Sequence, residues 1–162
     1  MIPADARVYV VDDDDSFVRS ALRLLASWGI RAEGFTSALD FLARDPTDGP
    51  ACALVDLRMP GVNGLELQEV LAEEGAWLPV VLMSGHTDAE SRVAALCSRA
   101  VDFVTKPVAE ERLLDALERA FAGAAEVTSG AARGGARPDV PPRRPERERF
   151  EPGGLAEADF AP

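Results

Sequence analysis

The sequence predicts an α/β fold, a doubly wound three-layer sandwich with a five-stranded parallel sheet between two layers of helices. Short apolar runs, typical of buried parallel strands, occur five times along the chain. Each run is followed by a segment whose apolar residues have helical spacing, which favours a parallel sheet covered by helices on both faces. Right-handed crossovers leave few arrangements for such units. We therefore expect five strands and five helices in a domain that ends near Phe121.

The expected elements follow one another as strand and then helix. The strands are expected at 7–11, 31–35, 51–55, 78–83 and 101–104, and helical spacing is found at 16–28, around 39–42, around 65–71, at 88–98 and at 108–121. Gly29 is expected to end the first helix, and Thr36 or Ser37 can cap the second. No internal repeat interrupts this alternation.

The composition changes after the last expected helix, which divides the chain into two parts. Residues 1–122 are expected to form the folded domain, and residues 123–162 a disordered tail rich in Gly, Pro, Arg and Glu. Such a tail has too few large apolar residues to offset the entropy lost on ordering. Its 6 Arg and 7 acidic residues nearly cancel, so almost all of the net charge of -11 belongs to the folded part.

Composition also excludes several classes of protein. The net charge of -11 argues against direct nucleic-acid binding, which favours a basic surface. No apolar window approaches the roughly 18 residues of a membrane span, and the start of the chain lacks the pattern of a signal peptide. Cys52 and Cys97 form no metal or redox motif and are expected to be buried free thiols. Together these observations predict a cytoplasmic protein that does not contact membranes.

Polar side chains stand where four of the expected strands end. Asp12 and Asp13 follow the first strand, Asp56 the third, Ser84 the fourth and Lys106 the fifth. The carboxyl ends of parallel strands share one edge of the sheet, where α/β proteins bind their ligands. We therefore expect these side chains to lie together.

The chemistry of this set favours phosphoryl transfer. Carboxylates brought close together repel each other, and Mg²⁺ relieves the repulsion because it prefers oxygen ligands. A lysine can hold a carboxylate and then a phosphoryl oxygen, and a serine can donate a hydrogen bond to the same group. An Asp56 nucleophile in this setting would form an acyl phosphate.

Simpler interpretations exist for each residue alone. Asp14 and Asp15 are expected only to support the start of the first helix, and Asp12 and Asp13 could extend that role. Ser84 could cap a turn, and Lys106 could be an ordinary surface lysine. Their joint occurrence at successive strand ends favours a site.

Four segments make the chain resemble the receiver domains of bacterial two-component response regulators, over roughly residues 7–121. The segments are Val10-Val11-Asp12-Asp13-Asp14, Val55-Asp56-Leu57-Arg58-Met59-Pro60-Gly61 with Asn63-Gly64, Ser84-Gly85-His86, and Asp102-Phe103-Val104-Thr105-Lys106-Pro107. The sequences of these segments are most similar to those of receivers of nitrogen-fixation-type regulators. The resemblance implies the flavodoxin-like strand order 2-1-3-4-5.

The resemblance also implies a role for each matching residue. Asp56 matches the phosphoacceptor and, with Asp12, Asp13 and the backbone carbonyl of Arg58, the Mg²⁺ site. Lys106 matches the lysine of the site, and its bond to Pro107 is expected to be cis. Ser84 and Phe103 match the hydroxyl and the aromatic residue of a two-state switch, which would remodel the face formed by the fourth helix, fifth strand and fifth helix.

Two positions depart from the family pattern. The family usually has Gly where this chain has Arg99, which would be strained if the position required a positive φ. Val108 stands where the family commonly has Phe. Both lie beside the expected output face. His86 is expected to be a loop residue near the site and not a phosphodonor.

The resemblance predicts a phosphorylation-activated response regulator, with a sensor histidine kinase as phosphodonor. A downstream target protein, a phosphotransfer protein or a phosphorylation-dependent homodimer would carry the output. We expect no enzymatic activity beyond self-phosphorylation and slow autodephosphorylation. An alternative is the receiver part of a transcription regulator whose DNA-binding domain is absent from this chain. A phosphohydrolase of the haloacid dehalogenase type, or a receiver-like fold that binds partners without phosphorylation, would explain the motifs less well.

Overall fold

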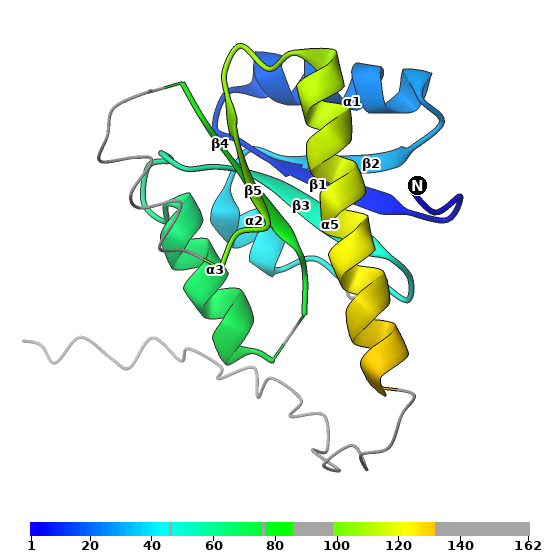
Figure 1. Ribbon diagram of the computed structural model, residues 1–162. Coiled ribbons are helices and arrows are strands. Elements are labelled where there is room, and N and C mark those ends of the chain that lie inside the picture. Colours follow the sequence, from blue (N-terminus) through cyan, green and yellow to red (C-terminus); the bar gives the residue numbers. More distant parts are fainter. Residues whose placement is uncertain (46, 76, 86–98, 132–162) are drawn as a thin grey trace, which may run out of the picture.

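The computed structural model describes residues 1–45, 47–75, 77–85 and 99–131 (Figure 1). In chain order the elements are β1 (Arg7–Val11), α1 (Asp15–Ser27), β2 (Arg31–Phe35), α2 (Ala38–Leu42), β3 (Ala51–Asp56), α3 (Gly64–Glu73), β4 (Val80–Ser84), β5 (Asp102–Thr105) and α5 (Glu110–Ala131). The helix expected at 88–98 lies outside the described residues. The same holds for His86, Cys97 and residues 132–162.

The strands form one parallel sheet in the order β2-β1-β3-β4-β5, as expected. The order puts β1 and β3 at the centre, where each has a strand on both sides. Continuous apolar strands suit this position because both faces of a parallel sheet are buried. The carboxyl ends of all five strands therefore meet at one edge.

Alternate side chains of the central strands enter two separate cores. Val8 and Val10 pack with residues of α1 and α5, whereas Tyr9 and Val11 pack with residues of α2 and α3. All four are at most 1% exposed. Figure 1 shows the corresponding layers, with α1 and α5 over one face of the sheet and α2 and α3 over the other. The three-layer prediction is confirmed.

Capping side chains fix where α1 and α3 begin. The Asp14 carboxylate accepts hydrogen bonds from the backbone N–H groups of Ser16 and Phe17, at 3.0 and 3.3 Å. Asn63 caps α3 in the same way and also donates to the Glu66 carboxylate at 2.8 Å. Such caps satisfy N–H groups that have no partner within the helix. Asp14 thus supports the start of α1, as the sequence predicted, and it does so as the N-cap.

The structure corrects one expectation and answers one open question. α5 continues to Ala131, ten residues beyond the expected end at Phe121, so residues 123–131 are helical rather than part of a disordered tail. Three of these nine residues are alanine, the strongest helix former, and Gly123 does not interrupt the helix. Arg99 carries no positive-φ strain, because within the described ranges only glycines have positive φ.

An ion-pair cluster joins β5 to α5. Both ends of the Arg112 guanidinium donate to the Asp102 carboxylate, at 2.8 and 2.7 Å, and Arg119 lies 3.4 Å from the same carboxylate. Arg112 also donates to the backbone carbonyl of Phe103 at 3.0 Å. The hydrogen bonds from Arg112 hold the pKa of Asp102 below its usual range. This bidentate contact between Arg112 and Asp102 fixes the position of β5, the strand that leads to Lys106.

Gly64, the first residue of α3, is packed too tightly to accept a side chain. An added Cβ would lie 2.8 Å from the backbone oxygen of Asp56 and 3.1 Å from the Cα of Leu57. Both atoms belong to the backbone that carries Asp56, so relief of the clash must displace either α3 or that backbone. We expect Gly64→Ala to lower the free energy of unfolding by about 1–3 kcal/mol, measured by urea denaturation.

Gly123→Ala is the matched control, because nothing lies within 4 Å of an added Cβ at this helical position. It should leave stability unchanged or raise it by about 0.5–1 kcal/mol, since alanine favours helix over glycine. Equal stability of Gly64→Ala and the wild type would contradict the tight contact between α3 and β3.

Candidate functional site

The sheet brings the predicted residues to its carboxyl edge. Asp12 directly follows β1, Asp56 ends β3, Ser84 ends β4 and Lys106 directly follows β5. Backbone hydrogen bonds continue the sheet past these ends, from Leu57 N to the Met83 oxygen and from Lys106 N to the Ser84 oxygen, both at 2.8 Å. The side chains therefore project from a rigid edge of the sheet.

Three carboxylates cluster at this edge. One carboxylate oxygen from each of Asp12, Asp13 and Asp56 lies within 4.8 Å of the others. Asp12 is fully buried and Asp56 is 7% exposed, whereas Asp13 is exposed. One Asp12 oxygen accepts a hydrogen bond from the backbone N–H of Asp14 at 3.0 Å, which fixes the orientation of this carboxylate.

Lys106 is the positive charge of the cluster. Its ammonium group donates a hydrogen bond to Asp12 and lies 3.8 Å from an Asp56 oxygen. The same group lies 4.2 Å from the centroid of the Phe17 ring, a cation–π contact on the side of α1. Sequence reasoning missed Phe17, since an aromatic residue in the first turn of a helix carries no signal that it contacts a lysine 89 positions later.

The environment raises the pKa of Asp56 to about 6. Burial is the main cause, and the neighbouring Asp12 carboxylate adds to it. Lys106 and a hydrogen bond from the backbone N–H of Arg58 oppose the rise. The Asp56 carboxylate is thus held in a setting where its negative charge is poorly compensated.

The donor set fits a small divalent cation. Mg²⁺–oxygen bonds of about 2.0–2.1 Å put two opposite ligands roughly 4 Å apart. The three carboxylate oxygens lie within 4.8 Å of one another, close to this spacing. A divalent charge would also balance the excess of three carboxylates over one lysine. The residues present therefore fit a magnesium site in which some ligands are water.

The remaining predicted residues lie close along the same elements. Ser84 is 1% exposed at the end of β4, and the Lys106–Pro107 peptide bond is cis, as expected. Arg58 follows Asp56 in a turn where Gly61 has a φ of 82°, which glycine adopts without strain. Phe103 lies three residues before Lys106 on β5, half-buried against the core beneath α2 and α3. It therefore stands outside the acid cluster itself.

Cys52 has no part in this site. It is buried in the core beneath α1 and α5, and burial raises the pKa of its thiol to about 12. It is a free cysteine, as expected. Among the described residues no helix is both long and apolar enough to cross a membrane.

Known proteins share both the sequence and the fold. Residues 8–118 match the family described as response regulator receiver domain. The response regulator protein TmoT of Ectopseudomonas mendocina is 40% identical over 114 residues, which cover 70% of this chain and 52% of TmoT. The transcriptional regulatory protein FixJ of Azorhizobium caulinodans is 36% identical over 77% of this chain and 59% of FixJ. The chain thus spans about half the length of these relatives.

A solved structure agrees with these matches. The crystal structure titled FixJ-N superposes with a TM-score of 0.68 and 33% identity, covering 73% of this chain and 94% of that one. A chemotaxis protein CheY4 of Vibrio cholerae, at 24% identity and a TM-score of 0.63, shares the fold. The family match covers more than half of the chain and includes every residue of the acid cluster. The chain therefore belongs to the response regulator receiver domain family of two-component systems.

Proposed function

We propose that Asp56 is the phosphoacceptor of this receiver. The observation that carries the proposal is the cluster of Asp12, Asp13 and Asp56 at one sheet edge, with Lys106 beside Asp56. In the reaction an Asp56 oxygen attacks the phosphorus of a phosphohistidine on a histidine kinase. The P–N bond breaks, the imidazole leaves, and an acyl phosphate remains on Asp56.

Mg²⁺ would be held by Asp12, Asp13, Asp56 and the backbone carbonyl of Arg58. When bound, the ion supplies positive charge that balances the carboxylates and the phosphoryl oxygens. Lys106 keeps its ion pair with Asp12 and lies near enough to Asp56 to reach a phosphoryl oxygen on it. Phe17 positions the lysine from the opposite side. These contacts favour transfer through electrostatic stabilisation, which is the main requirement of phosphoryl transfer.

The signal would leave through Ser84 and Phe103. Ser84 ends β4 beside the β5 residue Thr105, and its hydroxyl would follow the phosphoryl group. Phe103 would then turn inward, so that one local charge change biases a two-state element. The protein would act in the cytoplasm as a signalling switch without turnover of a separate substrate. Its output would be a target protein, a phosphotransfer protein or a homodimer.

A second output follows from the names of the relatives. FixJ is a transcriptional regulatory protein, and this chain matches little more than half of it. The same receiver chemistry would then control a DNA-binding domain that lies outside this sequence. The site itself is identical in both proposals, so the experiments below test the chemistry that they share.

The first experiment is intact-mass analysis after incubation with acetyl phosphate and Mg²⁺. We expect one phosphoryl group on the wild type and none on Asp56→Asn or in the presence of EDTA. Asp15→Asn is the control, because Asp15 is an exposed acid outside the cluster, paired with Arg19 at 3.1 Å. It should be phosphorylated like the wild type. An unmodified wild type, or an adduct that persists in Asp56→Asn, would refute the proposed phosphoacceptor.

The raised pKa of Asp56 predicts a pH-dependent stability in the absence of metal. The folded state binds this proton more tightly than the unfolded state does. The protonated Asp56 therefore makes its full contribution to the free energy of unfolding below about pH 4. This contribution is lost as the pH rises through about 6. Asn resembles the protonated acid. At pH 7.5 Asp56→Asn should therefore be more stable than the wild type by about 2–3 kcal/mol, and the difference should shrink towards pH 4.

Urea denaturation at both pH values measures this difference. Saturating Mg²⁺ at pH 7.5 should raise the stability of the wild type and close much of the gap, because the ion binds the folded state. Asp56→Asn should gain less. Identical stability of the two proteins across this pH range would show that Asp56 is not destabilised by its surroundings.

The switch predicts a separate role for Ser84. Phosphorylation should shift the amide NMR signals of β5 in the wild type, and Ser84→Ala should reduce these shifts while it still forms the adduct. The variant retains Asp56, Lys106 and the acid cluster, but lacks the hydroxyl that would follow the phosphoryl group. Ser20→Ala, an exposed serine on α1, is the control and should behave like the wild type. Full shifts in phosphorylated Ser84→Ala would contradict the switch.

A further inference from the structure

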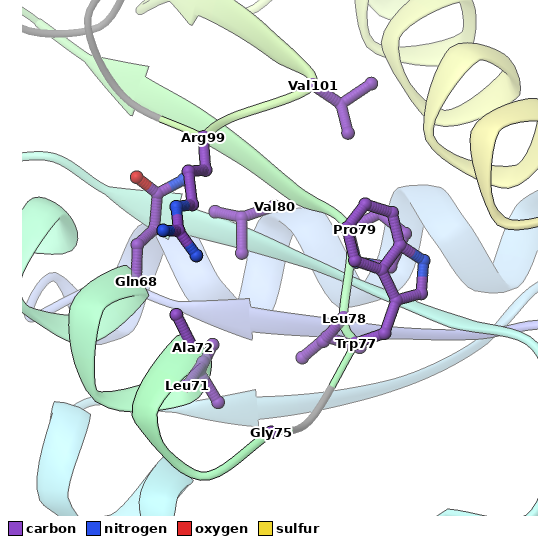
Figure 2. A pocket seen from close by; sticks show the side chains of 10 residues that line it. All are labelled: Gln68, Leu71, Ala72, Gly75, Trp77, Leu78, Pro79, Val80, Arg99 and Val101. Carbon is purple, nitrogen blue, oxygen red and sulfur yellow. The ribbon is translucent and has the colours of Figure 1, made fainter. Parts of the chain in front are cut away.

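A pocket lies at the edge of the sheet opposite the acid cluster, where α3 ends and β4 and β5 begin (Figure 2). Its volume is about 210 Å³. Leu71 and Ala72 of α3 form one wall, and Val80 of β4 lies across from them. Trp77 stands at one end and is 64% exposed, which is unusual for a large apolar side chain.

The other end of the pocket is polar. Figure 2 shows the Arg99 side chain alongside Gln68, with its guanidinium group directed into the pocket towards Leu71 and Ala72. Gln68 is 8% exposed, and its amide nitrogen is buried without a hydrogen-bond partner. In the described part of the chain no acid pairs with Arg99. A buried donor without an acceptor costs free energy, so its retention here indicates a missing partner.

These two side chains define the chemistry of that partner. A guanidinium group and an amide nitrogen offer only hydrogen-bond donors, so the ligand must present acceptors. A carboxylate is the acceptor that matches a guanidinium group best, because it accepts two parallel hydrogen bonds. The rest of the ligand must be apolar, because the aliphatic wall and Trp77 line the remainder of the pocket.

The volume limits the size of the ligand. A pocket of about 210 Å³ holds the equivalent of roughly seven water molecules at about 30 Å³ each. This is less than the roughly 300–1,000 Å³ of sites for drug-sized ligands. We propose that the pocket binds a small free monocarboxylate with a single apolar ring, with the carboxylate on Arg99 and Gln68 and the ring against Leu71 and Trp77. Benzoate is the simplest such molecule.

The overall negative charge of the chain makes binding of an anion a demanding test of this site. The chain has a net charge of -11, so an anion is repelled from most of its surface. Saturable binding of benzoate therefore requires a local cation, and the exposed Arg99, which pairs with no acid among the described residues, provides one. The proposal concerns a site remote from Asp56, and it stands or falls independently of phosphorylation.

The test is a titration of the full chain with benzoate, followed by Trp77 fluorescence. Trp28→Phe removes the second of the two tryptophans, so the signal comes from the pocket alone. We expect saturable binding in the millimolar range. Benzamide, a neutral molecule of nearly the same shape, should bind at least about tenfold more weakly, because it lacks the charge-assisted hydrogen bonds to Arg99. Absence of saturation, or equal binding of the two molecules, would overturn the proposal.

Two variants test the polar end, again by fluorescence. Arg99→Gln should weaken benzoate binding at least about tenfold, whereas Arg31→Gln removes the same charge from the remote edge strand β2 and should change nothing. Gln68→Leu should weaken binding and yet raise the urea midpoint, because it removes a buried amide without a partner. If Gln68 had only a structural role, Gln68→Leu would not combine weaker benzoate binding with a higher urea midpoint. Unchanged binding in Arg99→Gln would refute the site.

A further ligand separates a free acid from the end of a protein chain. N-acetylphenylalanine carries the same ring and carboxylate on a larger body that includes an amide. The proposal requires it to bind more weakly than benzoate, since the pocket has room for a single ring. Tighter binding of N-acetylphenylalanine would show instead that the pocket recognises a carboxyl-terminal residue of a partner.

Discussion

The repulsion among Asp12, Asp13 and Asp56 is the constraint on which this edge of the structure depends. Two of these carboxylates are nearly or fully buried, where an uncompensated charge is costly. Lys106 compensates one charge through Asp12 and reaches Asp56 only at 3.8 Å, so Asp56 stays under-compensated and its pKa rises to about 6. The same imbalance would favour binding of a divalent cation, which is in line with the phosphoryl chemistry that we propose for Asp56. The geometry of the site therefore leaves the negative charge of Asp56 only partly compensated.

The sheet explains why most of this could be predicted from sequence. Each functional side chain stands directly at the end of an apolar run, and parallel topology brings all such ends to one edge. Local sequence thus carried long-range information. Phe17 and the pocket around Arg99 depended instead on contacts between residues far apart in the chain, and nothing in their neighbours signals those contacts. The length of α5 was missed for another reason, because the change in composition after Phe121 predicted a disordered tail, whereas the helix continues through Gly123 to Ala131.

The α3 helix links the two edges of the sheet. Its first residue, Gly64, packs so closely that an added Cβ would lie 2.8 Å from the backbone oxygen of Asp56. Its later residues Gln68 and Leu71 line the pocket at the opposite edge. The contact at Gly64 leaves no room for a methyl group, so α3 and the end of β3 are held together rigidly. A displacement of α3 as a rigid body would therefore alter the surroundings of Asp56 and the pocket together.

The β5 strand shows how a switch can coexist with a rigid sheet. The Asp102 carboxylate accepts a hydrogen bond from the Phe103 N–H at 2.8 Å, and Arg112 donates to the Phe103 carbonyl at 3.0 Å. Arg112 is itself held by two hydrogen bonds to Asp102. The backbone of Phe103 is therefore fixed on both sides, while its ring is half-buried against the core beneath α2 and α3. Rotation about the side-chain bonds is the motion that this arrangement leaves to Phe103. In the switch that we propose, a phosphoryl group on Asp56 would therefore change the surface of β5 without breaking the sheet that positions Lys106.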